Sequence, residues 1–296
     1  MEPILFTPVT SPYLVPFDRS FRIAAAATRP PDDAPGKKDN EEALQETIER
    51  LDALQRKLYA HDRYGVLLIF QAMDAAGKDG TIRAVLRGIN PAGCQVWAFK
   101  APSPEELDHD FLWRCYARMP ERGRIGIWNR SHYEEVLVVR VNPGFLEAQR
   151  LPRVPTPLDE LWQQRYESIR EVERHWARSG WVVLKFFLHV SRDEQRKRLL
   201  ERIDDEDHQW KFEAGDLGVR RQWDAYMAAY QDALNATSRA WAPWYAIPAD
   251  SKAYMRRTVA EIVVDTMKQL ELHYPQVDER KAADMQRLRE ELERDK

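Results

Sequence analysis

Apolar and polar positions along the 296-residue chain alternate between helical spacing and short apolar runs. Between residues 39 and 61 the apolar side chains recur every three or four positions, which predicts an amphipathic helix. Short runs rich in branched and aromatic residues, followed by polar turns, predict strands. We expect strands at 64–72, 95–100, 124–129, 181–190 and 244–248, and further helices at 80–88, 105–118, 158–178, 251–272 and 277–295.

The alternation of strands with helix-length segments predicts an α/β fold, with a parallel sheet of about five strands flanked by helices. Another helix begins at Ser191, where Glu194 three residues later completes a capping-box pattern. We expect an irregular, proline-rich arm at 1–37, one domain at 38–275 with a helical lid at about 204–223, and a charged helix at 276–296. In such sheets, ligands bind beyond the carboxyl ends of the strands.

Composition restricts the classes of protein that this chain can belong to. Hydrophobic residues make up 44% and charged residues 31%, which excludes global disorder. No apolar run approaches the roughly 18 residues of a membrane span, and no secretory signal is visible. The two cysteines, Cys94 and Cys115, exclude a disulfide scaffold and fit a cytoplasmic location. The net charge of -3 argues against general nucleic-acid binding, so we expect neither nucleic-acid nor membrane partners.

The turn after the first predicted strand has the character of a phosphate-binding loop. Small residues let backbone N–H groups converge on an oxyanion, and a lysine at the start of the next helix adds positive charge. The candidate phosphate-binding residues are Ala75, Ala76, Gly77, Lys78, Asp79, Gly80 and Thr81. The usual G-x-x-x-x-G-K-[ST] pattern is imperfect, because Ala72 replaces the first glycine and Asp79 replaces the hydroxyl that holds magnesium. Asp74 is then the obvious metal ligand, although a chance Gly-Lys pair in a loop remains an alternative.

Polar residues follow the predicted strand at 124–129, at the position where P-loop enzymes place a magnesium-ligating acid. Asn129 can hydrogen-bond a phosphate or a metal-bound water, and Arg130 can form a forked contact with phosphate oxygens. Glu134 follows four residues after Arg130, so a surface ion pair is an alternative, but the location at a strand end favours a functional role. His132 lacks a partner at metal-ligand spacing, and we interpret it as a structural or exposed residue rather than a ligand.

A third segment, residues 208–221, combines two glycines with clustered basic residues. It suits a lid that delivers Lys211 and Arg220 to a phosphate, although a solvated helical connection fits equally well. The aromatic residues Trp223, Tyr226 and Tyr230 that follow have helical spacing, and we interpret them as core.

These three segments together resemble the polyphosphate kinase 2 family over residues 40–272. The resemblance implies a P-loop kinase fold, magnesium dependence and phosphoryl transfer between inorganic polyphosphate and purine nucleotides, in a homo-oligomer. Asn129 and the pair Glu134-Glu135 look like the branch that accepts both nucleoside mono- and diphosphates.

The resulting hypothesis is a polyphosphate:nucleotide phosphotransferase that converts AMP or ADP to ADP or ATP. Asp74, Lys78, Arg130 and Glu134 are the candidate catalytic residues, and Asp74 and Glu134 are the candidate metal ligands. Lys211 and Arg220 join Lys78 and Arg130 in binding polyphosphate. Two alternatives remain open: a nucleoside or nucleotide kinase that uses ATP as donor, and a degenerate P-loop protein with a regulatory role.

Overall fold

The computed structural model describes residues 5–207, 209 and 214–295. It contains a five-stranded sheet in the order β2-β3-β1-β4-β5, in which every neighbouring pair is parallel. The strands are β1 (Gly65–Gln71), β2 (Cys94–Ala98), β3 (Ile125–Asn129), β4 (Trp181–His189) and β5 (Trp244–Pro248). Strands β1 and β5 are buried along their whole length, as expected of a parallel sheet covered on both faces. The predicted α/β fold is confirmed.

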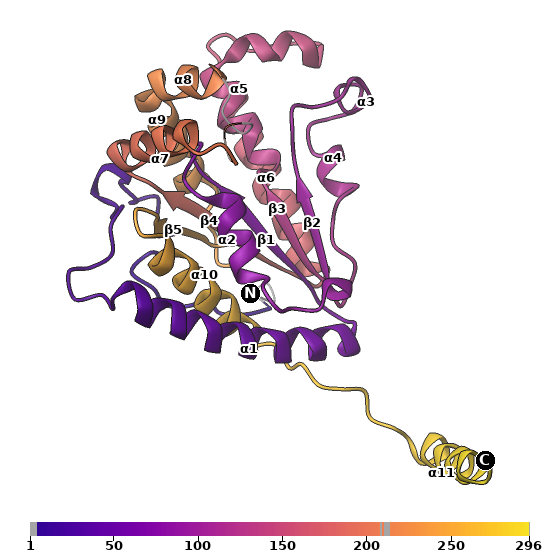
Figure 1. The fold of residues 1–296 in the computed structure, drawn as a ribbon. Coiled ribbons are helices and arrows are strands. Elements are labelled where there is room, and N and C mark those ends of the chain that lie inside the picture. Colours follow the sequence, from indigo (N-terminus) through magenta and orange to yellow (C-terminus); the bar gives the residue numbers. More distant parts are fainter. Residues whose placement is uncertain (1–4, 208, 210–213, 296) are drawn as a thin grey trace.

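Helices cover both faces of this sheet (Figure 1). The longer ones are α1 (Lys37–His61), α2 (Lys78–Val85), α6 (Asp159–Arg178), α7 (Arg192–Asp204), α8 (Ala214–Arg221), α9 (Trp223–Thr237), α10 (Lys252–Met267) and α11 (Glu279–Arg294). Helix α10 packs against both α1 and α2, whereas α6 packs against β4 and α9. Trp223, Tyr226 and Tyr230 on α9 are buried, so their interpretation as core residues is confirmed.

Two local expectations were wrong. The segment 105–118 forms two short helices, α3 (Pro104–Leu107) and α4 (Trp113–Tyr116), because an intervening turn is stabilised by the Asp110 carboxylate, which accepts from the Leu112 N–H. At Ser191 only half of the capping box forms. The Ser191 hydroxyl accepts from the Glu194 N–H, but the Ser191 N–H donates to Asp250, which leaves the Glu194 carboxylate to bind Arg198.

Short helices that the sequence pattern did not suggest connect β3 to α6. They are the 3-10 helices η3 (His132–Val136) and η4 (Pro143–Gln149) and the single-turn helix α5 (Val138–Val141). Two further short 3-10 helices, η1 (Ile23–Ala25) and η2 (Pro91–Gly93), lie elsewhere in the chain. Such one-turn segments lack the repeated apolar spacing from which a longer helix is recognised.

The N-terminal arm lies along the outer edge of β5. Leu14 forms an isolated antiparallel bridge with Tyr245, in which the Val15 N–H donates to the Trp244 carbonyl and the Ala246 N–H donates to the Tyr13 carbonyl. The arm therefore covers backbone groups that an edge strand would otherwise leave unpaired.

Helix α11 lies apart from the sheet and its covering helices (Figure 1), and none of its described residues is buried. Within the described part of the chain, every helix is too short or too polar to span a membrane.

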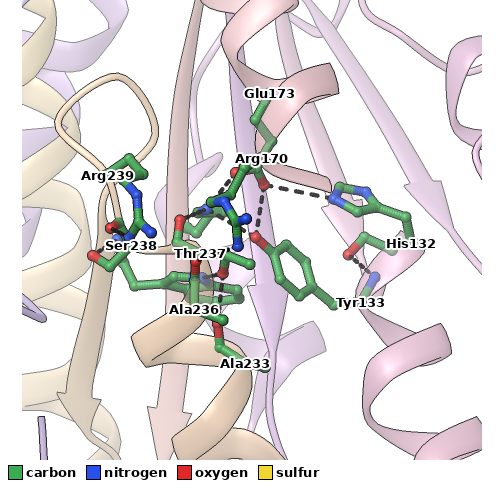
Figure 2. Close-up of polar contacts among 12 residues, drawn as sticks. His132, Tyr133, Arg170, Glu173, Ala233, Ala236, Thr237, Ser238 and Arg239 are labelled. Atoms are coloured by element: carbon green, nitrogen blue, oxygen red, sulfur yellow. Dashed lines mark hydrogen bonds and ion pairs between the residues drawn. The ribbon is translucent and has the colours of Figure 1, made fainter. Parts of the chain in front are cut away.

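The core has a polar centre, which lies between β4, α6, η3 and the end of α9. Lys185 in β4 and Glu173 on α6 are fully buried, and their charged atoms lie 2.5 Å apart. The Lys185 ammonium also donates to the Tyr133 hydroxyl and to the Thr237 carbonyl. Figure 2 shows Tyr133 and His132 on one side of Glu173: the Tyr133 hydroxyl donates to Glu173 over 2.8 Å, and His132 Nε2 lies 3.5 Å away.

Burial and pairing act in opposite directions on these buried groups. Burial lowers the pKa of Lys185 to about 8, although the neighbouring Glu173 carboxylate opposes this effect. Burial by itself would raise the pKa of Glu173, but Lys185 and His132 outweigh it and the pKa lies below its ordinary value. Burial also lowers the pKa of His132, which is buried rather than exposed.

This pair generates a stability prediction. Replacing Lys185→Met should destabilise the protein by about 3–5 kcal/mol, because the Glu173 charge would remain buried without its partner. Adding Glu173→Gln should restore most of the loss, since the double variant buries no charge. Urea denaturation of the two variants measures both values. The control is Lys38→Met, which removes an exposed pair with Glu42 and should cost less than about 1 kcal/mol. Equal stability of the single and double variants would contradict the prediction.

Candidate functional site

The candidate site lies where β1 and β3 end side by side. Phe70 of β1 is in register with Asn129 of β3, so the loop after β1 and the turn after β3 begin at the same level. We call residues 72–77, which connect β1 to α2, the phosphate loop. The parallel sheet therefore brings two sequence motifs together that lie about 50 positions apart in the chain.

Two positive φ angles shape the phosphate loop. Gly77 has a φ of 106°, which glycine adopts readily, whereas Ala75 has a φ of 60°. The left-handed region costs a residue with a Cβ atom about 1–2 kcal/mol. The conformation at Ala75 therefore needs stabilising contacts from the surrounding structure.

Helix α7 supplies such contacts to three consecutive carbonyl groups of the loop. Gln195 Nε2 donates to the Asp74 carbonyl over 3.0 Å, and an Arg198 N–H donates to the Ala76 carbonyl over 2.8 Å and to the Ala75 carbonyl at 3.5 Å. In a planar trans peptide the N–H points away from the C=O. Because these carbonyls face α7, the N–H groups of the same peptides point away from it. The Ala76 N–H donates to the Met73 carbonyl over 3.3 Å, which leaves the N–H groups of Ala75 and Gly77 on a side from which an anion can accept.

Arg198 also connects the loop to the end of β5. Its second terminal nitrogen donates to the Ala249 and Asp250 carbonyls at 2.6 and 3.1 Å, and its Nε lies 2.8 Å from the Glu194 carboxylate. Arg198 is buried, so this set of partners satisfies a guanidinium that water does not reach. Arg198 therefore links the phosphate loop to the end of β5.

Lys78 is half-buried rather than exposed at the mouth of the phosphate loop. Its Nζ donates to the Ala72 carbonyl over 2.8 Å, and burial lowers its pKa against the opposing effect of Asp74. Thr81 is fully buried and its hydroxyl donates to the Gly77 carbonyl, so it stabilises the first turn of α2. Asp79 is exposed, and its carboxylate accepts from the Asn129 amide over 2.5 Å.

Arg130 lies between the two candidate metal ligands. One of its terminal nitrogens lies 3.1 Å from Asp74 Oδ1 and the other lies 3.8 Å from Glu134 Oε2. The Glu134 carboxylate raises the pKa of Arg130, while burial raises the pKa of Glu134 against the effect of Arg130 and Lys78. Two carboxylates and two cations thus share one partly buried region, in which electrostatic interactions are stronger than in water.

Two tyrosines of α9 form part of the surroundings of this charge cluster. Burial raises the pKa of Tyr230 well above its usual range, and Glu134 and Asp74 add to the effect. Burial also raises the pKa of Tyr226, whose hydroxyl accepts from the Asn142 amide. These tyrosines therefore stay neutral. They are buried in the core and also lie near the charged residues of the site.

Helix α8 approaches the site through Arg220, which lies inside the segment expected to form a lid. An Arg220 N–H donates to the Gln195 side-chain oxygen over 2.9 Å and to the Arg192 carbonyl over 2.7 Å. Within the predicted lid segment, the described helices are the end of α7, at Asp204, and α8, which begins at Ala214. Lys211 lies outside the described residues.

The structure thus gathers Asp74, Lys78, Asn129, Arg130 and Glu134 around the phosphate loop. Sequence reasoning missed Gln195 and Arg198, which hold the loop from behind. Their positions three residues apart on one face of α7 are typical of a buried polar helix face, but no local pattern indicates what that face contacts.

Comparisons with known proteins show which family this chain is similar to. A family model described as polyphosphate kinase 2 matches residues 35–275. An ADP-polyphosphate phosphotransferase of Rhodopseudomonas palustris is 51% identical over 251 residues, covering 85% of this chain and 87% of that protein. An AMP/ADP-polyphosphate phosphotransferase of Meiothermus ruber is 48% identical over 241 residues, covering 81% and 86%. The crystal structure of polyphosphate kinase 2 from Arthrobacter aurescens TC1 superposes with a TM-score of 0.83 at 36% identity, covering 92% and 93%.

Proposed function

Because this chain belongs to the polyphosphate kinase 2 family, we propose that it transfers the terminal phosphoryl group of inorganic polyphosphate to AMP and ADP. It is a phosphotransferase of the P-loop kinase fold. One observation supports the proposal: the phosphate loop and the side chains of Lys78 and Arg130 lie together at the ends of β1 and β3, directly beside the carboxylates of Asp74 and Glu134.

In this proposal, positioning and charge neutralisation do most of the catalytic work. The phosphate loop and Lys78 bind the terminal phosphate of the donor, and Arg130 binds oxygens at the point of transfer. Lys211 and Arg220 bind further phosphates of the chain when the lid segment covers them. The attacking oxygen of the acceptor nucleotide is already anionic, so no strong general base is needed.

A magnesium ion fits the donor set around the loop. Asp74 and Glu134 are hard oxygen ligands that both lie near Arg130. Within the described part of the chain, no group of three or more His, Cys, Asp or Glu side chains could hold a metal, so a site would use at most two such side chains. Magnesium is usually bound by one or two carboxylates together with phosphate oxygens and waters. We therefore assign Asp74 and Glu134 to hold it. Bound there, the ion would neutralise charge on the transferring phosphate.

We assign the selection of the acceptor nucleotide to residues at and after the end of β3. Asn129 is neutral, and through hydrogen bonds it can tolerate acceptors of different charge. Glu134 completes the metal shell or orients the acceptor. The names of the two relatives, one for ADP and one for both AMP and ADP, support an acceptor range that includes both nucleotides.

We also retain the three-part division of the chain, with an arm at 1–37, a kinase-like domain at 38–275 and a charged helix at 276–296. The packing of the arm against β5 and the absence of buried residues in the described part of α11 support it. A homo-oligomer remains a proposal that sedimentation analysis can test.

The donor is the first property to test. Purified protein with polyphosphate, magnesium and either AMP or ADP, and without ATP, should produce ADP and ATP, which chromatography separates and quantifies. An ATP-dependent nucleoside kinase would produce nothing from these substrates, and a regulatory protein would turn over neither polyphosphate nor ATP. Formation of ADP from AMP without any ATP after prolonged incubation would exclude the dual-acceptor assignment.

Replacing Lys78→Ala should lower turnover about a hundredfold to a thousandfold, the usual cost of losing one electrostatic contact to the transition state. The exposed Lys57 on α1 provides a matched control, and Lys57→Ala should leave the rate unchanged. Circular dichroism and thermal melting report whether each variant is folded. A folded Lys78→Ala variant with a tenth of the wild-type rate would argue against the phosphate-loop assignment.

Replacing Asp74→Asn should raise the magnesium concentration needed for half-maximal rate by at least about tenfold, because the shell loses one anionic oxygen. High magnesium should restore part of the activity. The control is Asp265→Asn, which removes an exposed carboxylate on α10 that pairs with Lys268. A magnesium titration of all three proteins measures the effect, and identical curves would mean that Asp74 only stabilises the loop.

A further inference from the structure

Gln195 is a fully buried glutamine whose side chain connects the phosphate loop to α8. Its Nε2 donates to the Asp74 carbonyl over 3.0 Å, and its Oε1 accepts from Arg220 over 2.9 Å. The two ends of one rigid amide thus bind groups that lie far apart in the sequence. A neutral side chain that satisfies both its donor and its acceptor in this way is well suited to fix the distance between its partners.

The contact with Asp74 acts on the most strained peptide of the phosphate loop. The Asp74 carbonyl and the Ala75 N–H belong to the same planar unit, so fixing one direction fixes the other. Ala75 has the left-handed φ of 60°. Without the Gln195 donor this peptide would be freer to rotate, and the Ala75 N–H would no longer face the anion consistently.

The contact with Arg220 acts in a crowded region of positive charge. Burial lowers the pKa of Arg220, and the neighbouring Arg192 and Arg196 add to the effect by repulsion, while Asp193 opposes them. Two uncharged oxygens, of the Gln195 side chain and of the Arg192 backbone, hold the guanidinium in place. Arg220 therefore stays close to the phosphate loop only while these acceptors are available.

We propose that Gln195 is a positioning residue that couples α8 to the phosphate loop. When Arg220 binds its oxygen, the amide is oriented so that its nitrogen faces the Asp74 carbonyl, and the loop peptide is held in its anion-binding orientation. Binding of Arg220 to Gln195 and ordering of the phosphate loop are then coupled. This inference rests on the proposed function, because it takes Arg220 as a ligand of polyphosphate.

Two variants distinguish the effects of the two Gln195 hydrogen bonds. Gln195→Leu removes both hydrogen bonds at similar volume. Gln195→Glu keeps an acceptor for Arg220 but removes the donor to Asp74. Gln55→Leu, which alters a buried glutamine on α1 that contributes no group to the site, is the matched control.

Hydrogen exchange provides a readout that does not depend on catalysis. In Gln195→Leu, the amides of residues 214–221 should exchange at least about fivefold faster than in the wild type, because α8 loses one of the two hydrogen bonds through which Arg220 holds it to α7. In Gln195→Glu and in Gln55→Leu, their exchange should stay close to the wild-type rate. Unchanged exchange in Gln195→Leu would overturn the coupling.

Kinetics test the effect on the loop. Both Gln195 variants should lower kcat about tenfold or more while changing the KM for the nucleotide less than about threefold. In the Gln195→Leu background, adding Arg220→Ala should lower kcat by no more than about threefold. In the wild-type background the same substitution should lower kcat far more, because the two residues act as a unit. Additive losses, or a fully active Gln195→Glu, would overturn the proposal.

These readouts also separate this inference from the proposed function. If the wild-type protein produces no nucleotide from polyphosphate, the proposed function fails, and the exchange of residues 214–221 alone decides whether Gln195 holds α8. If the protein is active but its α8 exchange is insensitive to Gln195, the function stands and the coupling is wrong.

Discussion

The contact between Glu173 and Lys185 is the constraint on which the arrangement of the site depends. Both side chains are buried without access to water, so each charge is tolerable only while the other is 2.5 Å away. The pair links α6 to the middle of β4, and Tyr133 and Thr237 extend it to η3 and to the end of α9 (Figure 2). None of these elements can shift alone without separating a buried charge from its partners. Because Tyr133 directly precedes Glu134, the same contact fixes one wall of the site.

The phosphate loop is held from two sides by different kinds of interaction. Behind it, Gln195 and Arg198 of α7 bind backbone carbonyls, which directs the N–H groups of Ala75 and Gly77 away from α7. In front, Arg130 binds the carboxylates of Asp74 and Glu134. The first set determines the shape of the loop, and the second determines the charge that faces an incoming anion. A site for phosphoryl transfer needs both, because its catalysis depends on alignment and on neutralisation rather than on a strong base.

The charged residues of the site and the residues that hold them belong to different parts of the chain. Asp74, Lys78, Arg130 and Glu134 follow the carboxyl ends of β1 and β3, where the topology of a parallel sheet places ligand-binding groups. The residues that position them come from α6, α7 and β4. An α/β domain of this kind can therefore keep polar turns at this edge of the sheet, since neighbouring helices hold the turns in place.

The sequence by itself determined the succession of strands and longer helices along the chain, the parallel sheet and the candidate residues of the phosphate loop, because apolar periodicity and the Gly-Lys turn are local patterns. It did not determine that Lys185, an apparent interruption of a strand, pairs with Glu173, or that the segment 105–118 breaks into two helices. It also gave no sign that Gln195 binds the Asp74 carbonyl, 121 positions away in the chain. Only the tertiary structure decided these points. A hydrogen bond between distant residues depends on where packing places two elements relative to each other, and no local pattern of side chains encodes that distance.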